Sequence, residues 1–325
     1  MTIRRYKTSD RPRWNELVEY SVNGTFLFMR EYMEYHADRF CDHSLVYCDE
    51  RGVIIALLPA NEVTLPDGTR QLHSHQGLTF GGWIYGRHFH MSQLMEACGL
   101  TVEYLKAEGF SSFFYKQPPS IYHRAPAEGD EYALWRHGAV IDHCLVSASH
   151  LFPTATEGGC YIPFDATRQR RWRKLRDTQG YLLRPGRLEE FWPIMEANLR
   201  ERYGVAPVHT LAEMEMLQKR FPENIVCYVA ERQGEVTAGA VVYLSETVAH
   251  LQYAHSTPTG RKEGAIDFLY KELIEHPVVR GQRRYFDFGT SNEERGQYLN
   301  EALIAQKEGC GGRTIACRTY RIDIQ

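Results

Sequence analysis

The fold can be read most directly in one stretch of this chain of 325 residues, Tyr285-Phe-Asp-Phe-Gly-Thr-Ser-Asn-Glu293. Its alternating aromatic residues predict a strand, and polar residues follow at the end of that strand. Gly296 to Gly309 predicts a short helix with Lys307 near its C-terminal end. A glycine-rich turn, Gly311-Gly-Arg313, then precedes a final strand from Thr314 to Ile324. Strand, helix and strand in this order indicate an α/β fold.

The length and composition of the chain limit the possible classes of protein. The chain is long for one compact domain and suits two domains of ordinary size. Its 43% hydrophobic and 24% charged residues are typical of a soluble globular protein. The net charge of −3 gives no field that attracts nucleic acid, so we expect no DNA partner. The N-terminus lacks the apolar core of a signal peptide, and no apolar run reaches the ~20 residues that span a bilayer. We therefore expect a cytoplasmic protein without a transmembrane segment.

The cysteines carry no recognisable motif. All eight are scattered and none forms Cys-x-x-Cys, so we expect reduced thiols rather than disulfides. Cys48 and Cys227 lie in apolar, strand-like runs, where a free cysteine behaves as a small hydrophobic residue.

The chain contains the same unit twice, in diverged form. Tyr47 to Ala60 and Tyr228 to Tyr243 each predict a hairpin of two apolar strands around a charged turn with glycine. Three further pairs of segments follow in the same order: His73–Gly81 with His250–His255, Met91–Glu108 with Gly264–His276, and Phe110–Tyr115 with Arg284–Phe288. Strand and helix alternate in both halves, so we predict two tandem α/β domains with mixed sheets, 1–150 and 151–325.

The boundary between the two domains is expected near Ala148 to Arg176. This segment holds Pro153 and Gly158-Gly159 before a basic run, Arg168-Gln-Arg-Arg-Trp-Arg-Lys-Leu-Arg176. The run is either the solvated face of a helix or a collar for phosphates on a substrate, with Trp172 as a packing or stacking partner.

A basic turn with glycine opens a helix in the second half. Ile266, Leu269 and Leu273 recur at helical spacing, and Gly260-Arg-Lys-Glu-Gly264-Ala265 precedes them. The first N–H groups of a helix are unpaired and its N-terminus carries partial positive charge, so such a turn suits an anion. We predict that a phosphorylated cofactor contacts Gly260, Arg261, Lys262, Gly264 and Ala265.

Asp287 is a candidate catalytic carboxylate. It lies between Phe286 and Phe288, so its side chain points to the opposite face of the strand from the two rings. It either orients Lys307 or accepts a proton from the substrate, or it is an exposed or structural residue. Polar residues follow it where α/β sheets usually bind ligands. We predict substrate contacts there by Ser291, Asn292 and Asn300.

Paired histidines are predicted on strands at His73-Ser-His75 and His88-Phe-His90. No third ligand is evident at a fitting position, so we expect no metal. His75 and Gln76 precede Gly81-Gly82, where a backbone approaches a ligand closely, and this pattern indicates the floor of a substrate cleft. His75 is then either a general base or a buried, hydrogen-bonded residue. The equivalent segment of the second half adds Tyr253 and His255 as substrate contacts.

Aromatic and basic residues mix between Asn23 and Phe40. Either an apolar core helix or a pocket for a sugar or nucleotide sugar explains the mixture, and the second reading makes Tyr32 a substrate contact. The sequence has no Walker loop, Rossmann fingerprint, Gly-x-Ser-x-Gly elbow or His-Glu-x-x-His motif, so nothing supports nucleotide hydrolysis, α/β-hydrolase chemistry or a zincin.

The block from Phe286 to Gly312 resembles the C-terminal signature of the FemABX-like branch of the GNAT acyltransferases, in which an "FDFG…LN…FK…FGG" pattern recurs. Gly24–Phe40, Ser74–Gly82 and Asp287–Glu293 are similar to bacterial members that are associated with surface-polysaccharide gene clusters. The resemblance covers about residues 20 to 322. It implies two tandem GNAT-like domains and a reaction, acyl transfer to an amine.

The resemblance also implies roles for residues. In the family, the lysine of the "FK" pair is assigned to oxyanion stabilisation, and the resemblance implies this role for Lys307. Alternatively, Lys307 complements the helix dipole, as a lysine in the last turn of a helix does. Gln306 stands where the family has an aromatic residue. The turn Gly260–Ala265 is similar to the GNAT pyrophosphate loop and implies acyl-CoA, such as acetyl-CoA, as the donor. Ile266 departs from the glycine or alanine of that loop.

We therefore predict direct N-acyl transfer from acyl-CoA to an amino sugar on a nucleotide or lipid carrier, in cell-surface polysaccharide biosynthesis. His75 or Asp287 takes the proton of the amine, and Lys307 with a backbone N–H stabilises the oxyanion. Two alternatives remain. One is Fem-type transfer from aminoacyl-tRNA, which is disfavoured because the chain lacks the coiled-coil arm that many peptidoglycan Fem enzymes carry. The other is a non-catalytic tandem GNAT module that binds a ligand.

Overall fold

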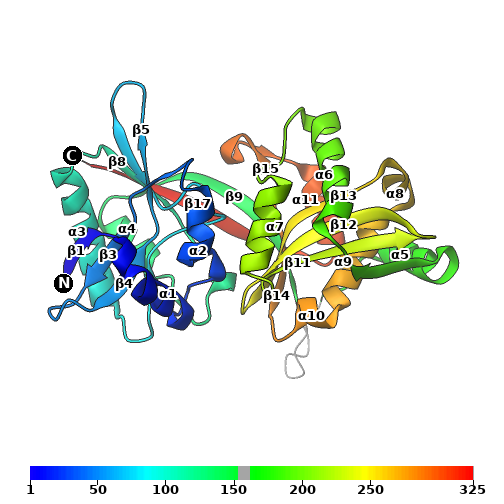
Figure 1. Cartoon of the computed structure of the whole chain (residues 1–325), viewed down its shortest axis with the longest axis horizontal. Coiled ribbons are helices and arrows are strands. Elements are labelled where there is room, and N and C mark those ends of the chain that lie inside the picture. The colour runs from blue at the N-terminus through cyan, green and yellow to red at the C-terminus, as the bar shows by residue number, and fades with distance from the viewer. Residues whose placement is uncertain (153–161, 325) are drawn as a thin grey trace. The chain divides into compact units, whose positions relative to one another are not determined.

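The computed structural model of this protein describes residues 1–152 and 162–324. Unit 1 comprises residues 1–145 and 316–325, and unit 2 comprises residues 146–315 (Figure 1). The unit boundaries lie inside two long strands, β9 (Val140–Leu151) and β17 (Arg313–Asp323). The observed division differs from a single cut between residues 150 and 151, because the last strand returns the chain to unit 1. Pro153 and Gly158-Gly159 of the expected boundary segment lie outside the described residues.

Unit 2 is built on a mixed sheet. Its strand order is β10 (Tyr181–Pro185), β11 (Ile225–Arg232), β12 (Glu235–Leu244), β13 (Val248–Ser256), β14 (Tyr285–Thr290) and β9. Neighbouring strands pair antiparallel except β13 and β14, which pair parallel. Gln233 and Gly234 join β11 to β12 with positive φ angles, as tight hairpin turns favour. The hairpin predicted from Tyr228 to Tyr243 is confirmed.

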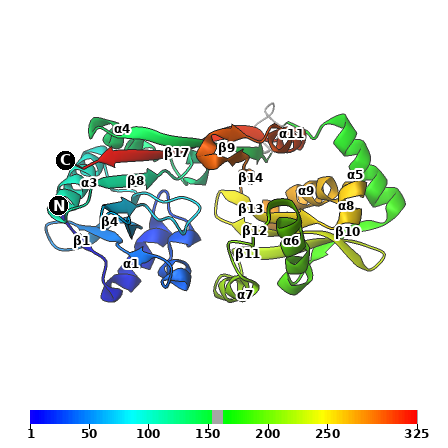
Figure 2. The same cartoon turned by 90° about the horizontal axis from the view of Figure 1, so that it is seen from above.

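Helices cover both faces of this sheet (Figure 2). Gly239 of β12 faces Phe191 of α6 (Leu188–Tyr203), where an added Cβ would lie 2.5 Å from the ring. The next residue, Ala240, packs in one buried cluster with Phe268 of α9 (Ala265–Glu275). Because successive residues of a strand point to opposite faces, α6 and α9 lie on opposite sides of the sheet. α7 (Leu211–Arg220) packs beside α6.

Three more helices of unit 2 position the candidate site. The basic run forms α5 (Ala166–Gln179), which begins at the N-cap Asp165 and packs on α9. α8 (Pro258–Glu263) leads into α9 through Gly264, and α10 (Pro277–Arg280) follows α9. α11 (Glu301–Gly309) begins at Asn300, whose side chain accepts a hydrogen bond from the Leu303 N–H. The predicted helix with Lys307 in its last turn is thus confirmed.

Unit 1 contains two smaller sheets. The first has the order β1 (Thr2–Arg5), β3 (Leu45–Cys48), β4 (Ile54–Leu58) and β7 (Ile84–Tyr85). The second has the order β17, β8 (Ser112–Lys116), β6 (Arg70–His73), β5 (Asn61–Thr64) and β2 (Cys41–Asp42). Its helices are α1 (Arg11–Tyr20), α2 (Arg30–Met33), α3 (Met91–Ala107) and α4 (Gly129–Arg136). Trp83, Phe113 and Tyr115 lie fully inside its core.

The two units repeat some features and differ in others. β6 and β8 pair parallel in unit 1, as β13 and β14 do in unit 2, and the predicted hairpin Tyr47 to Ala60 forms β3 and β4. However, β6 pairs on its other side with β5 rather than β4, so the sheet of unit 1 is divided. Both units are mixed α/β structures, which confirms the predicted fold class.

Two predictions about histidines are wrong. β6 ends at His73, and His75 lies beyond it with a left-handed φ of 66°. His88 and His90 lie in the turn before α3, not on a strand. In both cases a glycine-rich or turn segment interrupts the alternation on which the prediction rested.

Candidate functional site

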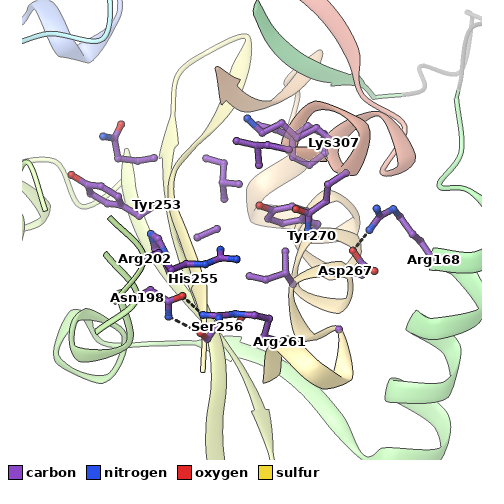
Figure 3. A pocket seen from close by; sticks show the side chains of 18 of the residues that line it. Arg168, Asn198, Arg202, Tyr253, His255, Ser256, Arg261, Asp267, Tyr270 and Lys307 are labelled. Atoms are coloured by element: carbon purple, nitrogen blue, oxygen red, sulfur yellow. Dashed lines mark hydrogen bonds and ion pairs between the residues drawn. The ribbon is translucent and has the colours of Figure 1, made fainter. Parts of the chain in front are cut away.

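A cavity of about 680 Å³ opens in unit 2. Its walls include residues 251–256 of β13, the end of β14, and side chains of α9 and α11 (Figure 3). Asn198 and Arg202 of α6 line it from one face of the sheet, and Arg168 and Arg171 of α5 line it from the other. Side chains from both faces of the sheet therefore meet in one cavity.

The cavity lies where β13 and β14 separate. The two strands pair over three positions, from Val248 opposite Tyr285 to His250 opposite Asp287. Beyond this point β13 continues to Ser256 beside β12 alone, while β14 continues beside β9. We call the space between the two unpaired edges, which residues of both strands line, the passage.

A β-bulge shapes the wall of this passage. Tyr253 pairs with Val241 and Leu251 with Val242, so Gln252 is the extra residue. A bulged residue is left out of the ladder of backbone hydrogen bonds. The Gln252 Oε1 atom is also buried without a hydrogen-bond partner among the described residues. This oxygen can accept a hydrogen bond from an N–H donor in the cavity.

Lys307 lies at the cavity wall with its ammonium group saturated. Nζ donates to the Gly289 carbonyl at 2.8 Å, to the Thr290 carbonyl at 2.7 Å and to Ser291 Oγ at 3.0 Å. Burial lowers the pKa of Lys307 to about 8, and the nearby Asp287 opposes this shift, so the ammonium form prevails at neutral pH. Lys307 thus holds the end of β14 and is one of the residues that line the cavity.

Asp287 lies behind the wall rather than in it. Its carboxylate accepts hydrogen bonds from Ser147 Oγ at 2.5 Å and from the Gly289 N–H at 3.0 Å, and it contacts His250 Nδ1 at 3.0 Å. As predicted, it points away from Phe286 and Phe288, which lie in the core shared with α9. His250 could not be recognised from the sequence, because its partner lies 37 residues away and becomes adjacent only through the parallel pairing of β13 and β14.

The α6 side of the cavity carries a neutral histidine among cations. His255 lines the cavity, and its ring lies over Phe191 with centroids 6.4 Å apart. Burial, and then the charges of Arg202 and Arg261, lower the pKa of His255 to about 4. Arg261 donates to Asn198 Oδ1 at 2.5 Å, and Asn198 in turn donates to the Ser256 carbonyl at 2.7 Å (Figure 3). The second predicted contact on this face, Tyr253, lines the cavity and bonds to His209 Nδ1 at 2.6 Å.

The residues of the turn predicted to hold a cofactor lie in three different surroundings: the cavity, a second groove and the core. Arg261 and Gly264 line the cavity, whereas Lys262 lines a second groove. Gly260 and Ala265 are buried, and a Cβ on Gly260 would collide with the Thr237 carbonyl. These two residues therefore serve close packing of α8 and α9 on β12.

A clamp of two arginines and one carboxylate covers the N-terminus of α9. Asp267, in the first turn of this helix, is buried and pairs with Arg168 and, at 2.6 Å, with Arg171. The Arg171 side chain also lies directly against Gly264, whose φ is +89°. A carboxylate is favourable at this helix end, so the clamp occupies the place where an anionic ligand would bind.

A second groove of about 500 Å³ runs between α5 and α8. Its cations include Arg170, Lys174 and Lys262, which have no hydrogen-bond or ion-pair partner among residues 1–152 and 162–324. Glu263 also lines the groove, but its carboxylate is engaged by Tyr181 and Arg232. The groove therefore presents net positive charge beside the cavity.

Three predicted site residues, His75, Gln76 and Tyr32, belong to unit 1. His75 is 3% exposed, and burial lowers its pKa to about 3. Gln76 is exposed and exchanges two hydrogen bonds with Asn61. Tyr32 is buried in α2 and packs edge-on against Tyr35. None of the three lines the cavity of unit 2.

The three polar residues predicted after β14 have structural partners. Ser291 accepts from Lys307, as described, and Asn292 Oδ1 accepts from the Val146 N–H at 2.6 Å. Asn300 caps α11 and donates to Glu293. They hold the segment between β14 and α11 and thereby position Lys307.

Several residues of the cavity were not foreseen in the sequence. Asn198 and Arg202 reach it from α6, while Asp267 and Tyr270 reach it from α9. Their only sequence signal was polar or charged character within amphipathic helices, which surface positions share.

Within residues 1–152 and 162–324, no group of three or more His, Cys, Asp or Glu residues is placed to hold a metal ion. The helices of these residues include none with the length and apolar character needed to cross a membrane. Cys160 lies outside the described residues, and the other seven cysteines form no disulfide with one another.

Residues 165–298 match the family described as an acetyltransferase (GNAT) domain, so this part of the chain carries a GNAT domain. The match contains β10 to β14 and most of the cavity wall. No curated protein sequence matches the chain.

The fold is similar to that of solved tandem proteins. FemX superposes with a TM-score of 0.70 at 10% identity, over 99% of this chain and 97% of that chain. A tandem GNAT protein from the clavulanic acid biosynthesis pathway gives 0.55 at 13% identity, over 100% and 98%. The C-terminal domain of a protein assigned as a lysylphosphatidylglycerol synthetase from Agrobacterium fabrum gives 0.58 at 13% identity, over 96% and 91%. The resemblance to FemABX-like tandem GNAT proteins is thus confirmed by the GNAT domain and the fold.

Proposed function

We propose that unit 2 transfers an acyl group from an activated donor to an amine. The observation that carries the proposal is the cavity at the separation of β13 and β14, inside the GNAT domain. Its α9 face offers cations for a donor with phosphates, and its α6 face offers His255, Tyr253 and Gln252 for an amine. A donor and an acceptor that enter from opposite faces would meet in this passage.

The donor is acyl-CoA in this proposal. Arg168 and Arg171 stand at the N-terminus of α9, and the second groove continues the positive charge with Arg170, Lys174 and Lys262. Arg171 is the more exposed of the two arginines, so it can bind a diphosphate while Arg168 keeps the buried Asp267 carboxylate paired. A guanidinium group at this place supports a phosphorylated donor at this end of the cavity.

Lys307 stabilises the oxyanion in the proposed reaction. Its three ammonium protons are donated to Gly289, Thr290 and Ser291, so Lys307 acts through its positive charge rather than through a direct hydrogen bond, and exclusion of water strengthens this effect. Asp287 has a positioning role, because its carboxylate holds His250 and the Gly289 N–H at the end of β14. We assign no step to His75, which is packed in the core of unit 1.

The acceptor proposed from the sequence resemblance is an amino sugar on a nucleotide or lipid carrier, used in cell-surface polysaccharide biosynthesis. The polar lining of the α6 face supports an acceptor with several hydrogen-bonding groups.

The test is a binding and transfer assay on the full chain. Acetyl-CoA, longer acyl-CoAs and an aminoacyl-tRNA are titrated calorimetrically, and the donors that bind are incubated with glucosamine and with UDP-linked amino sugars. We expect an acyl-CoA to bind and to give an amide product. The double variant Lys307→Ala, Asp287→Ala should lose transfer, and unchanged turnover in that variant would refute the assigned roles. Arg173→Gln, an exposed cation of α5 outside both cavities, is the control.

One observation favours aminoacyl-tRNA as the donor instead. The turn departs from the GNAT pyrophosphate pattern at Ile266, and the Arg171 side chain packs against Gly264. Binding of an aminoacyl-tRNA but of no acyl-CoA would establish this alternative. The affinity should then fall steeply with salt concentration, and neutral substitutions of Arg170 and Lys174 should abolish this dependence. Binding of an amino-sugar nucleotide without any donor would establish the non-catalytic alternative.

A further inference from the structure

The α6 end of the cavity contains charges that acyl transfer alone does not explain. Arg202 lines the cavity and has no hydrogen-bond or ion-pair partner among the described residues. Arg261 faces the same space and is held by Asn198, which is 6% exposed and anchored to the Ser256 carbonyl. Two guanidinium groups without a carboxylate between them form a site for a carboxylate or phosphate.

His255 lies between these cations and the passage. Its ring is fixed over Phe191, and its nitrogens have no hydrogen-bond partner within residues 1–152 and 162–324. Gln252, three residues earlier on β13, offers its unpartnered Oε1 atom at the same wall. Figure 3 shows Arg202, His255, Asn198 and Arg261 together at one end of the cavity and Lys307 at the other.

We infer that His255 is the proton acceptor for the acceptor amine, and that the acceptor carries an anionic group, a carboxylate or a phosphate, that binds Arg202 and Arg261 beside it. This inference rests on the proposed function, and it narrows the acceptor to anionic amines. It also replaces His75 and Asp287 as the base, since His255 alone of the three lines the cavity.

The proton and bond changes balance without another reactant. The acceptor ammonium gives one proton to His255 and becomes a neutral amine. The amine nitrogen then forms a C–N bond to the acyl carbon, and the bond from that carbon to the leaving sulfur or oxygen breaks. The second proton of the nitrogen passes to the leaving group, and His255 releases the first proton to solvent.

The surroundings of His255 explain why an anionic acceptor helps the reaction. Burial lowers the pKa of His255 to about 4, and the charges of Arg202 and Arg261 add to this shift, so the imidazole is a weak base at neutral pH. The other charged groups of the cavity are Lys307 on α11, and Arg168 and Arg171 paired with Asp267. An anion bound to the two arginines cancels the nearest positive charge, so the same ligand that places the amine also raises the basicity of His255.

The first test measures the titration of His255 by NMR in the full chain labelled in its histidine rings. The His255 signal is the one absent from His255→Gln. Sodium acetate or inorganic phosphate is added to the wild type, to Arg202→Gln and to the control Arg173→Gln. We expect one of the anions to raise the midpoint of the His255 titration by about one pH unit in the wild type and the control, since the effect of burial remains. We expect little change in Arg202→Gln. The anion that acts identifies a carboxylate or a phosphate as the ligand chemistry.

An absent shift with both anions, or an equal shift in Arg202→Gln, overturns the inference. This result does not depend on acyl transfer, so it is distinguishable from a failure of the proposed function.

The second test uses a donor that supports transfer. Glucosamine 6-phosphate is compared with glucosamine, and glycine with glycinamide. We expect at least one anionic amine to be preferred by tenfold or more in kcat/KM, with the preference lost in Arg202→Gln. His255→Gln should lower kcat at neutral pH, and its rate should recover as the pH rises toward the pKa of the amine. Equal use of charged and uncharged amines, or an unchanged pH profile in His255→Gln, overturns the inference while the transferase function stands.

Discussion

Lys307 Nζ lies 2.7 Å from the Thr290 carbonyl oxygen, and this hydrogen bond ties the last turn of α11 to the end of β14. The lysine that the sequence singles out for chemistry is therefore also a structural link at the cavity wall. Its two roles can be separated by experiment.

Lys307→Met keeps most of the buried stem and removes the ammonium group. We expect it to lower the free energy of unfolding by about 2–3 kcal/mol, because the Gly289 and Thr290 carbonyls lose a charged donor. Urea unfolding measures this change. Transfer is then assayed well below the unfolding midpoint. A rate that stays near the wild-type value under those conditions would leave Lys307 only its structural role.

Gly264→Ala tests the turn between α8 and α9. A left-handed φ of +89° strains alanine by about 1–2 kcal/mol, and the new methyl group would displace Arg171. Gly180→Ala is the matched control, since Gly180 ends α5 at a φ of +66° with open space around it. We expect both variants to lose stability in thermal unfolding and only Gly264→Ala to lose affinity for the donor. Equal donor affinity in the two would mean that the donor does not approach this turn.

The double variant Arg170→Gln, Lys174→Gln tests the second groove. Both residues are exposed, so we expect the free energy of unfolding to change by less than about 0.5 kcal/mol. We expect the Kd of a phosphorylated donor to rise by about five- to tenfold at low salt, and the difference to shrink at high salt. Calorimetry at two ionic strengths measures both effects. Arg173→Gln, on the same helix but outside the groove, should bind as the wild type does.

His75 makes unit 1 sensitive to acid. Burial, and next the neighbouring His36, lower its pKa to about 3, whereas an unfolded histidine titrates near 6.5. Between pH 6.5 and 3 the unfolded state binds more protons, so stability is fully present above pH 6.5 and falls as the pH falls toward 3. The slope is up to about 1.4 kcal/mol for each pH unit.

His75→Asn removes this titration and retains a residue that tolerates the left-handed φ. We expect a shallower decrease in stability between pH 6.5 and 4 than in the wild type, measured by urea unfolding at several pH values. His255→Gln serves as a comparison in unit 2. An identical slope in His75→Asn and the wild type would contradict the proton linkage.

Much of unit 2 could be predicted from local sequence. The aromatic alternation around Asp287 predicted β14 and the opposite orientation of the carboxylate, because side chains of a strand alternate by geometry. The spacing of Ile266, Leu269 and Leu273 predicted α9, because one helical face meets the core. The hairpins formed as expected, since their turns contain glycine between apolar runs.

Other sequence predictions were wrong or incomplete where one local sequence pattern is compatible with more than one structure. His73-Ser-His75 resembles a strand, yet the chain leaves the sheet at His73 and turns through a left-handed residue. The glycines of the turn before α9 resemble a ligand loop, yet Gly260 is needed for contact with Thr237. Residue type alone does not distinguish close packing from ligand approach.

Periodicity in the sequence was enough to predict the main strands and helices of unit 2 and the position of Lys307 at a helix end, because both depend on local spacing. The GNAT resemblance came from short motifs. Which side chains share the cavity depends instead on how the elements pack. Asn198, His255 and Arg261 are far apart in the chain or on different elements, and they meet because β13 and β14 separate after His250 and Asp287. The separation depends on which strands pair and where the pairing stops, and this is a property of the assembled sheet rather than of any one segment.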